Sequence, residues 1–180
     1  MQNRREYIIQ FVGLAIGEHL YEYVITDKFF EDREYSEIQK SNINLKINLL
    51  KQSTMMVLHF DISGTVKADC DRCTEEFDLP ITGNYKLIVK VGGSLTGDED
   101  DDIITIPANE HELDLSQHIY EYIALSLPIK RVHPDNKKGE PTCNKEMLEK
   151  LSSFLTEEEK SEEEEPTDPR WDGLKNITLN

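Results

Sequence analysis

Residues 44–50 read NLKINLL and residues 54–62 read TMMVLHFDI, and these two stretches decide the fold class. Apolar and polar residues alternate in both, which is the period of a β-strand with one buried face. The apolar face carries Leu45, Ile47 and Leu49 in the first stretch, and Met56, Leu58 and Phe60 in the second. The polar residues 51–53 lie between them, so the pattern predicts two antiparallel neighbours.

The flanking sequence extends the same pattern in both directions. Further strands are predicted over residues 7–14, 19–25, 64–68, 76–81, 84–91 and 103–106. Helical spacing of apolar residues predicts a turn of helix after Asp27, a helix between Asp114 and Leu127, and a final helix over 145–155, capped by Asn144. The chain is therefore expected to be α+β: an antiparallel β-meander or partly closed barrel, with C-terminal helices packed on it.

Composition divides the chain into three parts. Residues 1–155 are expected to form a single α+β domain, and residues 156–167 an acidic disordered linker. Residues 168–180 hold the only tryptophan, Trp171, with Leu174 three positions later, and are expected to form a short docking segment. Packing of Trp171 on its own domain is the alternative.

The formal net charge of −16 is concentrated in two runs, 98–102 and 156–169. No segment carries the stripe of Lys and Arg that binding to a nucleic-acid backbone needs, so tight autonomous binding of DNA or RNA is not expected. A basic protein partner is compatible with the charge. One local basic set is a candidate for RNA contact: Lys130, Arg131, Lys137 and Lys138.

The sequence favours the cytoplasm and gives no sign of a membrane segment. No apolar run approaches the roughly 18 residues that a membrane-spanning helix needs. The N-terminal apolar stretch resembles a signal peptide at first, but Gln10 interrupts it and acidic Glu18 and Glu22 follow. An odd number of cysteines, two of them only three apart, does not fit a secreted disulfide framework.

The stretch Cys70-Asp71-Arg72-Cys73 is the strongest candidate for a chemical site. Two thiolates separated by two residues can grip one metal ion, and a zinc site then needs two further ligands to close a tetrahedron. His133 and Cys143 lie in the polar loop between the last two predicted helices and can supply them. The sequence therefore suggests a structural zinc site made of Cys70, Cys73, His133 and Cys143.

Two alternatives to a metal stay open for this turn. The cysteines can be two reduced thiols packed in a reducing compartment. They can also be a redox pair, but that chemistry needs a thiolate with a lowered pKa, and the neighbouring Asp71, Glu75 and Glu76 disfavour the negative form.

No arrangement of a nucleophile, a base and an orienting acid is readable elsewhere, and no nucleotide-binding loop appears. His111 and His118 are seven residues apart at the start of a predicted helix, and we interpret them as ordinary surface histidines. The chain is therefore not expected to be an enzyme.

Several motifs together resemble the YceD-like family, the large ribosomal RNA subunit accumulation proteins. The core of the resemblance is CDRCTEEF at 70–77, preceded by GTV at 64–66. Downstream it includes VKV at 89–91, DLS at 114–116, LSLP at 125–128, Cys143 and DPRW at 168–171. Thr74 departs from the leucine that the family usually has at this position.

The resemblance implies a cytoplasmic ribosome-biogenesis factor that supports processing or accumulation of large-subunit (23S) ribosomal RNA. It implies no catalytic residues, and its partners would be ribosomal precursor RNA or ribosomal and assembly proteins. Two alternatives from other classes remain: a metal- or thiol-dependent enzyme that uses Cys70 and Cys73, and a general protein-interaction module.

Overall fold

The computed structural model describes residues 4–31, 33, 36–92, 102–135, 139 and 142–158. Its contacts divide the chain into two compact units, Met1–His133 and Pro134–Asn180. The first unit contains the β-sheet and α2 (Ser116–Leu125), and the second contains α3 (Lys145–Glu158). The predicted boundaries at residues 155 and 167 stay a prediction, because the chain beyond residue 158 lies outside the described residues.

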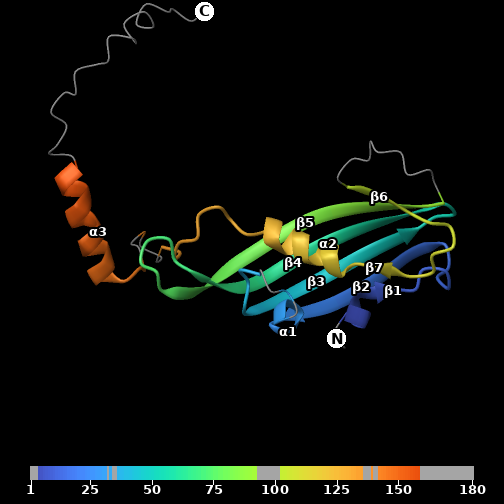
Figure 1. Ribbon diagram of the computed structural model, residues 1–180, viewed down its shortest axis with the longest axis horizontal. Helices are drawn as coiled ribbons and strands as arrows, with labels where there is room; N and C mark the ends of the chain where they lie inside the picture. The colour runs from blue at the N-terminus through green and yellow to red at the C-terminus, as the bar shows by residue number, and fades with distance from the viewer. Residues whose placement is uncertain are drawn as a thin grey trace, which may run out of the picture. The chain divides into compact units, whose positions relative to one another are not determined.

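The first unit is built on one five-stranded sheet (Figure 1). Its strands are β2 (Gly17–Thr26), β3 (Ser41–Lys51), β4 (Met55–Asp69), β5 (Glu76–Val91) and β6 (Ile103–Ile106), side by side in chain order. The first four are antiparallel, whereas β6 runs parallel to β5. The α+β class and the meander are confirmed, and the sheet is open rather than closed into a barrel.

The alternation that predicted the strands also sets the core. Leu45, Ile47 and Leu49 of β3 are fully buried, and so are Leu58 and Phe60 of β4. The polar residues between them, such as Asn44, Lys46 and Asn48, are exposed on the other face. Because side chains alternate strictly along a strand, a slip of one residue would expose this entire apolar set, so the register is firmly specified.

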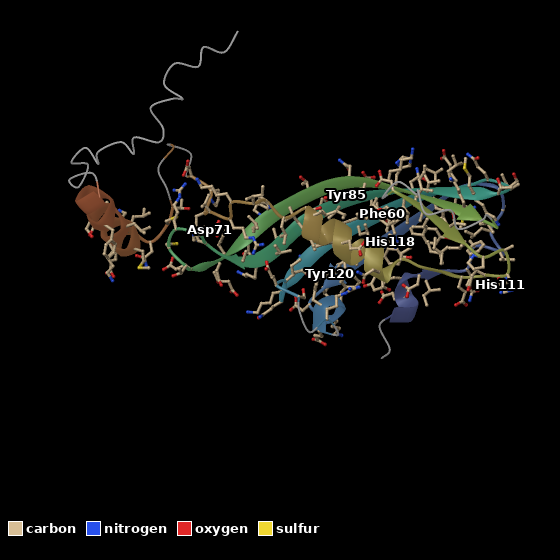
Figure 2. The ribbon with its side chains drawn as sticks, turned by 45° about the horizontal axis from the view of Figure 1, so that its top comes forward. Phe60, Asp71, Tyr85, His111, His118 and Tyr120 are labelled. Atoms are coloured by element: carbon tan, nitrogen blue, oxygen red, sulfur yellow. The ribbon has the colours of Figure 1, made fainter. Side chains whose placement is uncertain are left out.

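Helix α2 covers the apolar face of the sheet (Figures 1 and 2). Its Ile119 and Ile123 are fully buried. The Tyr122 ring packs against Phe60 of β4, with centroids 5.0 Å apart, and stacks on Tyr85 of β5 at 4.6 Å. Asp114 accepts a hydrogen bond from the backbone N–H of Ser116 at 2.8 Å, which satisfies one of the exposed donors at the helix start.

The N-terminal segment differs from the prediction. Residues 7–14 do not form one strand: η1 (Arg4–Tyr7) leads into the two-residue β1 (Ile8–Ile9), which pairs with β7 (Leu113–Asp114). The buried residues there come from three kinds of structure: Tyr7 ends η1, Ile9 belongs to β1, and Phe11 lies in the chain that follows. The predicted helical turn after Asp27 is confirmed as α1 (Lys28–Glu31), with both of its phenylalanines buried.

Strands β4 and β5 are longer than the sequence predicts, because β4 runs through residue 63 and β5 through residues 82–83, where the prediction leaves gaps. Pro80 lies inside β5, opposite Thr65. At the hairpin end of the same two strands, Cys70 and Glu75 form a hydrogen-bonded pair, in which the Cys70 N–H donates to the Glu75 carbonyl. Hydrogen-bonded pairs alternate with non-hydrogen-bonded pairs along an antiparallel ladder, so the Thr65–Pro80 pair is a non-hydrogen-bonded one. The backbone of residue 80 therefore faces away from β4, toward the edge of β5 where β6 pairs only from Ile88 onward. The missing N–H of proline therefore costs no ladder hydrogen bond.

In the second unit, α3 confirms the predicted final helix and extends it by one turn. The Asn144 carboxamide oxygen accepts a hydrogen bond from the backbone N–H of Glu146 at 3.0 Å, as the predicted cap requires. None of the helices in the described part of the chain is long and apolar enough to cross a membrane.

The close approach of β3 and β4 at Gly64 leads to a first prediction. A β-carbon at position 64 would overlap the carbonyl oxygen of Asn42 and lie 2.6 Å from the Cα of Ile43, both backbone atoms that cannot move aside cheaply. Gly64→Ala should lower the free energy of unfolding by about 2 kcal/mol, measured by urea denaturation. Gly13→Ala, where nothing lies within 4 Å, is the matched control and should change it little; equal effects would contradict the account.

Candidate metal site

The Cys70–Cys73 turn closes the long hairpin between β4 and β5. The Cys70 N–H donates to the Glu75 carbonyl at 3.0 Å, and the Thr74 N–H donates back to the Cys70 carbonyl at 2.8 Å. Thr74 adopts a left-handed conformation with φ of 58°. This reversal lets the chain turn within four residues while both thiols stay on the inside, where each is 1% exposed.

A second segment, the loop after α2, is held against this turn by a reciprocal pair of hydrogen bonds. The Asp71 N–H donates to the Arg131 carbonyl at 2.8 Å, and the Arg131 N–H donates to Asp71 Oδ2 at 2.6 Å. The Arg131 guanidinium is anchored separately by Glu37 at 2.9 Å. We call the two Asp71–Arg131 bonds the backbone clamp. It fixes the chain two residues before His133.

The clamp places His133 beside the cysteines. Its Nδ1 lies 3.5 Å from Cys73 Sγ. One face of the His133 imidazole also packs on the Phe77 ring, with the ring centroids 4.5 Å apart. A histidine held at one nitrogen by sulfur and across its face by an aromatic ring has little freedom to turn.

The structure brings together all four residues that the sequence nominated. One ligand atom each of Cys70, Cys73, His133 and Cys143 lies within 4.8 Å of the others. The three cysteines are reduced and buried, with Cys143 4% exposed. Three sulfurs and one imidazole nitrogen at this spacing form a donor set that zinc prefers for structural sites, so these residues can hold a metal ion.

The surroundings of Cys70 favour its thiolate. Burial raises the pKa of the thiol, but backbone hydrogen bonds at Arg72, Cys73 and His133, together with the His133 side chain, outweigh burial and lower the pKa from 9.0 to about 6. A thiolate is the form that ligates metal. The carboxylates that made a thiolate look unfavourable in the sequence are exposed: Asp71, Glu75 and Glu76.

The other candidate residues do not join this cluster. His111 is exposed and His118 lies on α2, both remote from the turn that Asp71 marks (Figure 2). Burial lowers the pKa of His118, against the opposing effect of Glu121 and Asp114. Within the basic set, Lys130 is exposed and Arg131 is paired with Glu37. The remaining candidates lie outside the described residues: Lys137, Lys138, Trp171 and Leu174.

Sequence reasoning missed the residues that support the ligands. The sequence indicates Asp71 only as a source of negative charge, and Arg131 only as a candidate for RNA contact. One signal was available: an Asp side chain in a turn commonly accepts hydrogen bonds from backbone N–H groups. Its partner 60 residues away could not be read from the sequence.

A comparison with known protein families gives one match. Residues 58–178 match the YceD family, described as large ribosomal RNA subunit accumulation protein YceD. The chain belongs to this family. No curated protein and no solved structure matches it. The family match begins in β4 and takes in all four residues of the cluster, whereas β2 and β3 precede it. Its description connects the chain with the accumulation of large-subunit ribosomal RNA.

The strained Thr74 leads to a second prediction. A β-branched residue in the left-handed region costs about 1–2 kcal/mol relative to glycine, which adopts it freely. Thr74→Gly should therefore raise the free energy of unfolding by about 1 kcal/mol in thermal or urea denaturation, part of the relief being offset by the greater freedom of glycine in the unfolded chain.

Thr82→Gly is the matched control for Thr74→Gly. Thr82 is exposed within strand β5, where a glycine weakens the strand. This variant should be destabilised, so the two substitutions should have opposite signs. If both lowered stability, the left-handed turn would not be a source of strain.

Proposed function

We propose that this protein is a non-catalytic, cytoplasmic ribosome-biogenesis factor that supports processing or accumulation of large-subunit (23S) ribosomal RNA by binding. In this proposal Cys70, Cys73, His133 and Cys143 hold a structural zinc ion. The observation that carries the proposal is the family match over residues 58–178, which includes a complete set of four metal ligands.

The ligand set supports a structural role over a catalytic one. A catalytic zinc ion keeps one coordination position open for water or substrate, whereas four protein ligands fill the tetrahedron. The two turn cysteines and Cys143 are almost completely buried, which leaves little access for a substrate. The ion would join the β4–β5 turn to the chain around His133 and Cys143, and its binding energy would contribute to folding.

The charge of the chain bears on what it binds. A net charge of −16 opposes contact with a phosphate backbone and favours basic proteins. Ribosomal precursor RNA is therefore the partner in a complex, reached through ribosomal or assembly proteins that are themselves basic.

Depletion of the protein in its own cells should lower the level of mature large-subunit ribosomal RNA, measured against small-subunit RNA. An unchanged ratio would contradict the proposed function.

Metal analysis gives a third prediction. The purified full chain should contain about one zinc ion per chain, and Cys73→Ser should lose it, because three ligands hold zinc far more weakly than four. His111→Ala is the matched control, since this exposed histidine lies outside the cluster, and it should keep its zinc. Retention of zinc by Cys73→Ser would show that the ion is held elsewhere.

The backbone clamp gives a fourth prediction. Asp71→Ala removes the acceptor of the Arg131 N–H but leaves every ligand in place. Groups that orient metal ligands typically change metal affinity by about 10–100-fold when they are removed. Competition with a chelator should therefore show zinc binding weakened by at least about tenfold. Asp61→Ala, an equal change of charge on the exposed face of β4, should bind zinc as the wild type does.

A further inference from the structure

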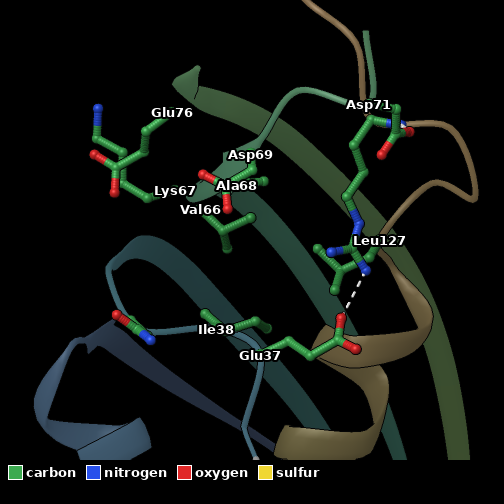
Figure 3. Close-up of a pocket in the computed structure, with 11 residues that line it drawn as sticks. Glu37, Ile38, Val66, Lys67, Ala68, Asp69, Asp71, Glu76 and Leu127 are labelled. Carbon is green, nitrogen blue, oxygen red and sulfur yellow. Dashed lines mark hydrogen bonds and ion pairs between the residues drawn. The ribbon is translucent and has the colours of Figure 1, made fainter. Parts of the chain in front are cut away.

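A groove lies beside the metal site, at the end of β4 (Figure 3). Its volume is about 410 Å³, and all of its lining belongs to the first unit. One wall is the end of β4, from Val66 to Asp69, and the facing wall is the segment Glu37–Gln39 that leads into β3. Leu127 and Arg131, from the chain after α2, close one side.

The groove exists because β3 begins too late to pair with the end of β4. Ser41, the first residue of β3, is opposite Val66, and the last bond to this side of β4 runs from the Lys67 N–H to the Lys40 carbonyl at 2.9 Å. Two pairs of residues further along, the Asp71 N–H donates to the Arg131 carbonyl in the clamp. Both ends of the gap are therefore filled, by Lys40 and by Arg131.

The backbone of Asp69 lies between these two filled positions and faces the same side. In an antiparallel strand, alternate residues direct their N–H and C=O groups to the same neighbour, and the Cys70 N–H is bonded in the other direction, to Glu75 of the hairpin. Residues 67, 69 and 71 therefore present their backbones to the groove. Within the described part of the chain, no hydrogen bond satisfies the Asp69 N–H there. An unpaired strand edge of this kind is a template for an extended peptide.

The side chains that surround this edge carry excess negative charge. Asp69 and Glu76 are the last register partners of β4 and β5, so two acidic residues stand directly opposite each other, an arrangement that destabilises a sheet. Glu37 and Asp71 add two more acids to the lining. The two cations of the lining are already engaged, Arg131 with Glu37 at 2.9 Å and Lys67 with Asp78 at 3.1 Å. From beside the lining, the exposed Lys40 lies 3.9 Å from Glu76, a loose ion pair that an incoming Lys or Arg would replace.

The floor of the groove is apolar. Val66 and Ile38 are 1% and 4% exposed, and Leu127 is half-buried beside them. Figure 3 shows Val66 and Ile38 between the acidic groups, with Asp69 above them. Apolar floor and acidic rim together match the side chain of arginine or lysine, whose aliphatic stem packs on apolar surface while its charged end reaches a carboxylate.

We propose that this groove binds an extended, basic segment of a protein partner, which pairs with the open backbone of Asp69 and places a Lys or Arg side chain between Asp69 and Glu76. The inference deepens the proposed function, on which its biological meaning rests, by naming the chemistry of the partner: an arginine- or lysine-bearing strand. RNA is the poorer occupant, because its phosphates would meet four carboxylates.

Fluorescence anisotropy with the purified full chain tests this proposal. The probe is a short labelled peptide of alternating Arg and Thr, which favours an extended backbone and carries the required charge. Wild type should bind it, with affinity that falls as salt rises. The double variant Asp69→Asn, Glu76→Gln should bind about fivefold more weakly, since each partly exposed ion pair contributes little. Relief of the facing carboxylates should leave this variant at least as stable as the wild type.

Matched controls separate the groove from general charge. Asp61→Asn with Glu110→Gln removes two exposed carboxylates elsewhere in the first unit and should leave binding unchanged. A probe whose backbone is N-methylated at every second residue keeps its charge but should lose binding. Three results would each overturn the proposal. The two double variants could bind the peptide equally well, or the N-methylated probe could bind as well as the unmethylated one. A labelled single-stranded RNA could also bind more tightly than the peptide and lose that binding in the groove variant.

The test also separates this proposal from the proposed function. Peptide binding is measured on the purified chain, whereas ribosomal RNA levels are measured in cells. A groove that fails to bind the peptide while depletion still lowers large-subunit RNA would reject only the groove. Specific peptide binding without any effect on that RNA would reject only the ribosomal role.

Discussion

The pair of hydrogen bonds between Asp71 and Arg131 is the constraint on which both the position of His133 and the groove at the end of β4 depend. It joins the tip of the β4–β5 hairpin to the chain that follows α2, two segments 60 residues apart in sequence. The same bonds have consequences on both sides. Toward the core they bring His133 to Cys73, and toward solvent they close one end of the groove at Asp69. A metal ion would add coordinate bonds to four side chains that the backbone hydrogen bonds already hold near one another.

The sequence predicts the strands of the sheet well where one face of the strand is buried and the other is exposed to solvent. Leu45, Ile47 and Leu49 are read correctly because period-two alternation has one structural meaning at that length. The four clustered residues are predictable for a different reason: cysteines are few, and a zinc site needs four donors, so Cys70 and Cys73 call for partners and the chain offers His133 and Cys143.

The sequence fails where the outcome depends on long-range pairing. The prediction leaves gaps at residue 63 and at residues 82–83, where pairing with the neighbouring strands carries β4 and β5 through without a break. The apolar residues at 7–14 look like one strand, but only Ile8 and Ile9 pair, with β7 more than 100 residues away. The late start of β3 relative to β4, which creates the groove, depends on sheet register and leaves no local signature in residues 37–40.

In the proposed function, Cys70, Cys73, His133 and Cys143 together ligate one zinc ion. X-ray absorption at the zinc edge, recorded on the purified full chain, tests it most directly because it counts sulfur and nitrogen neighbours of the ion. We expect three sulfurs at about 2.3 Å and one nitrogen at about 2.0 Å. A first shell of oxygen and nitrogen without sulfur would contradict it, because the ion would then be bound away from the cysteine turn.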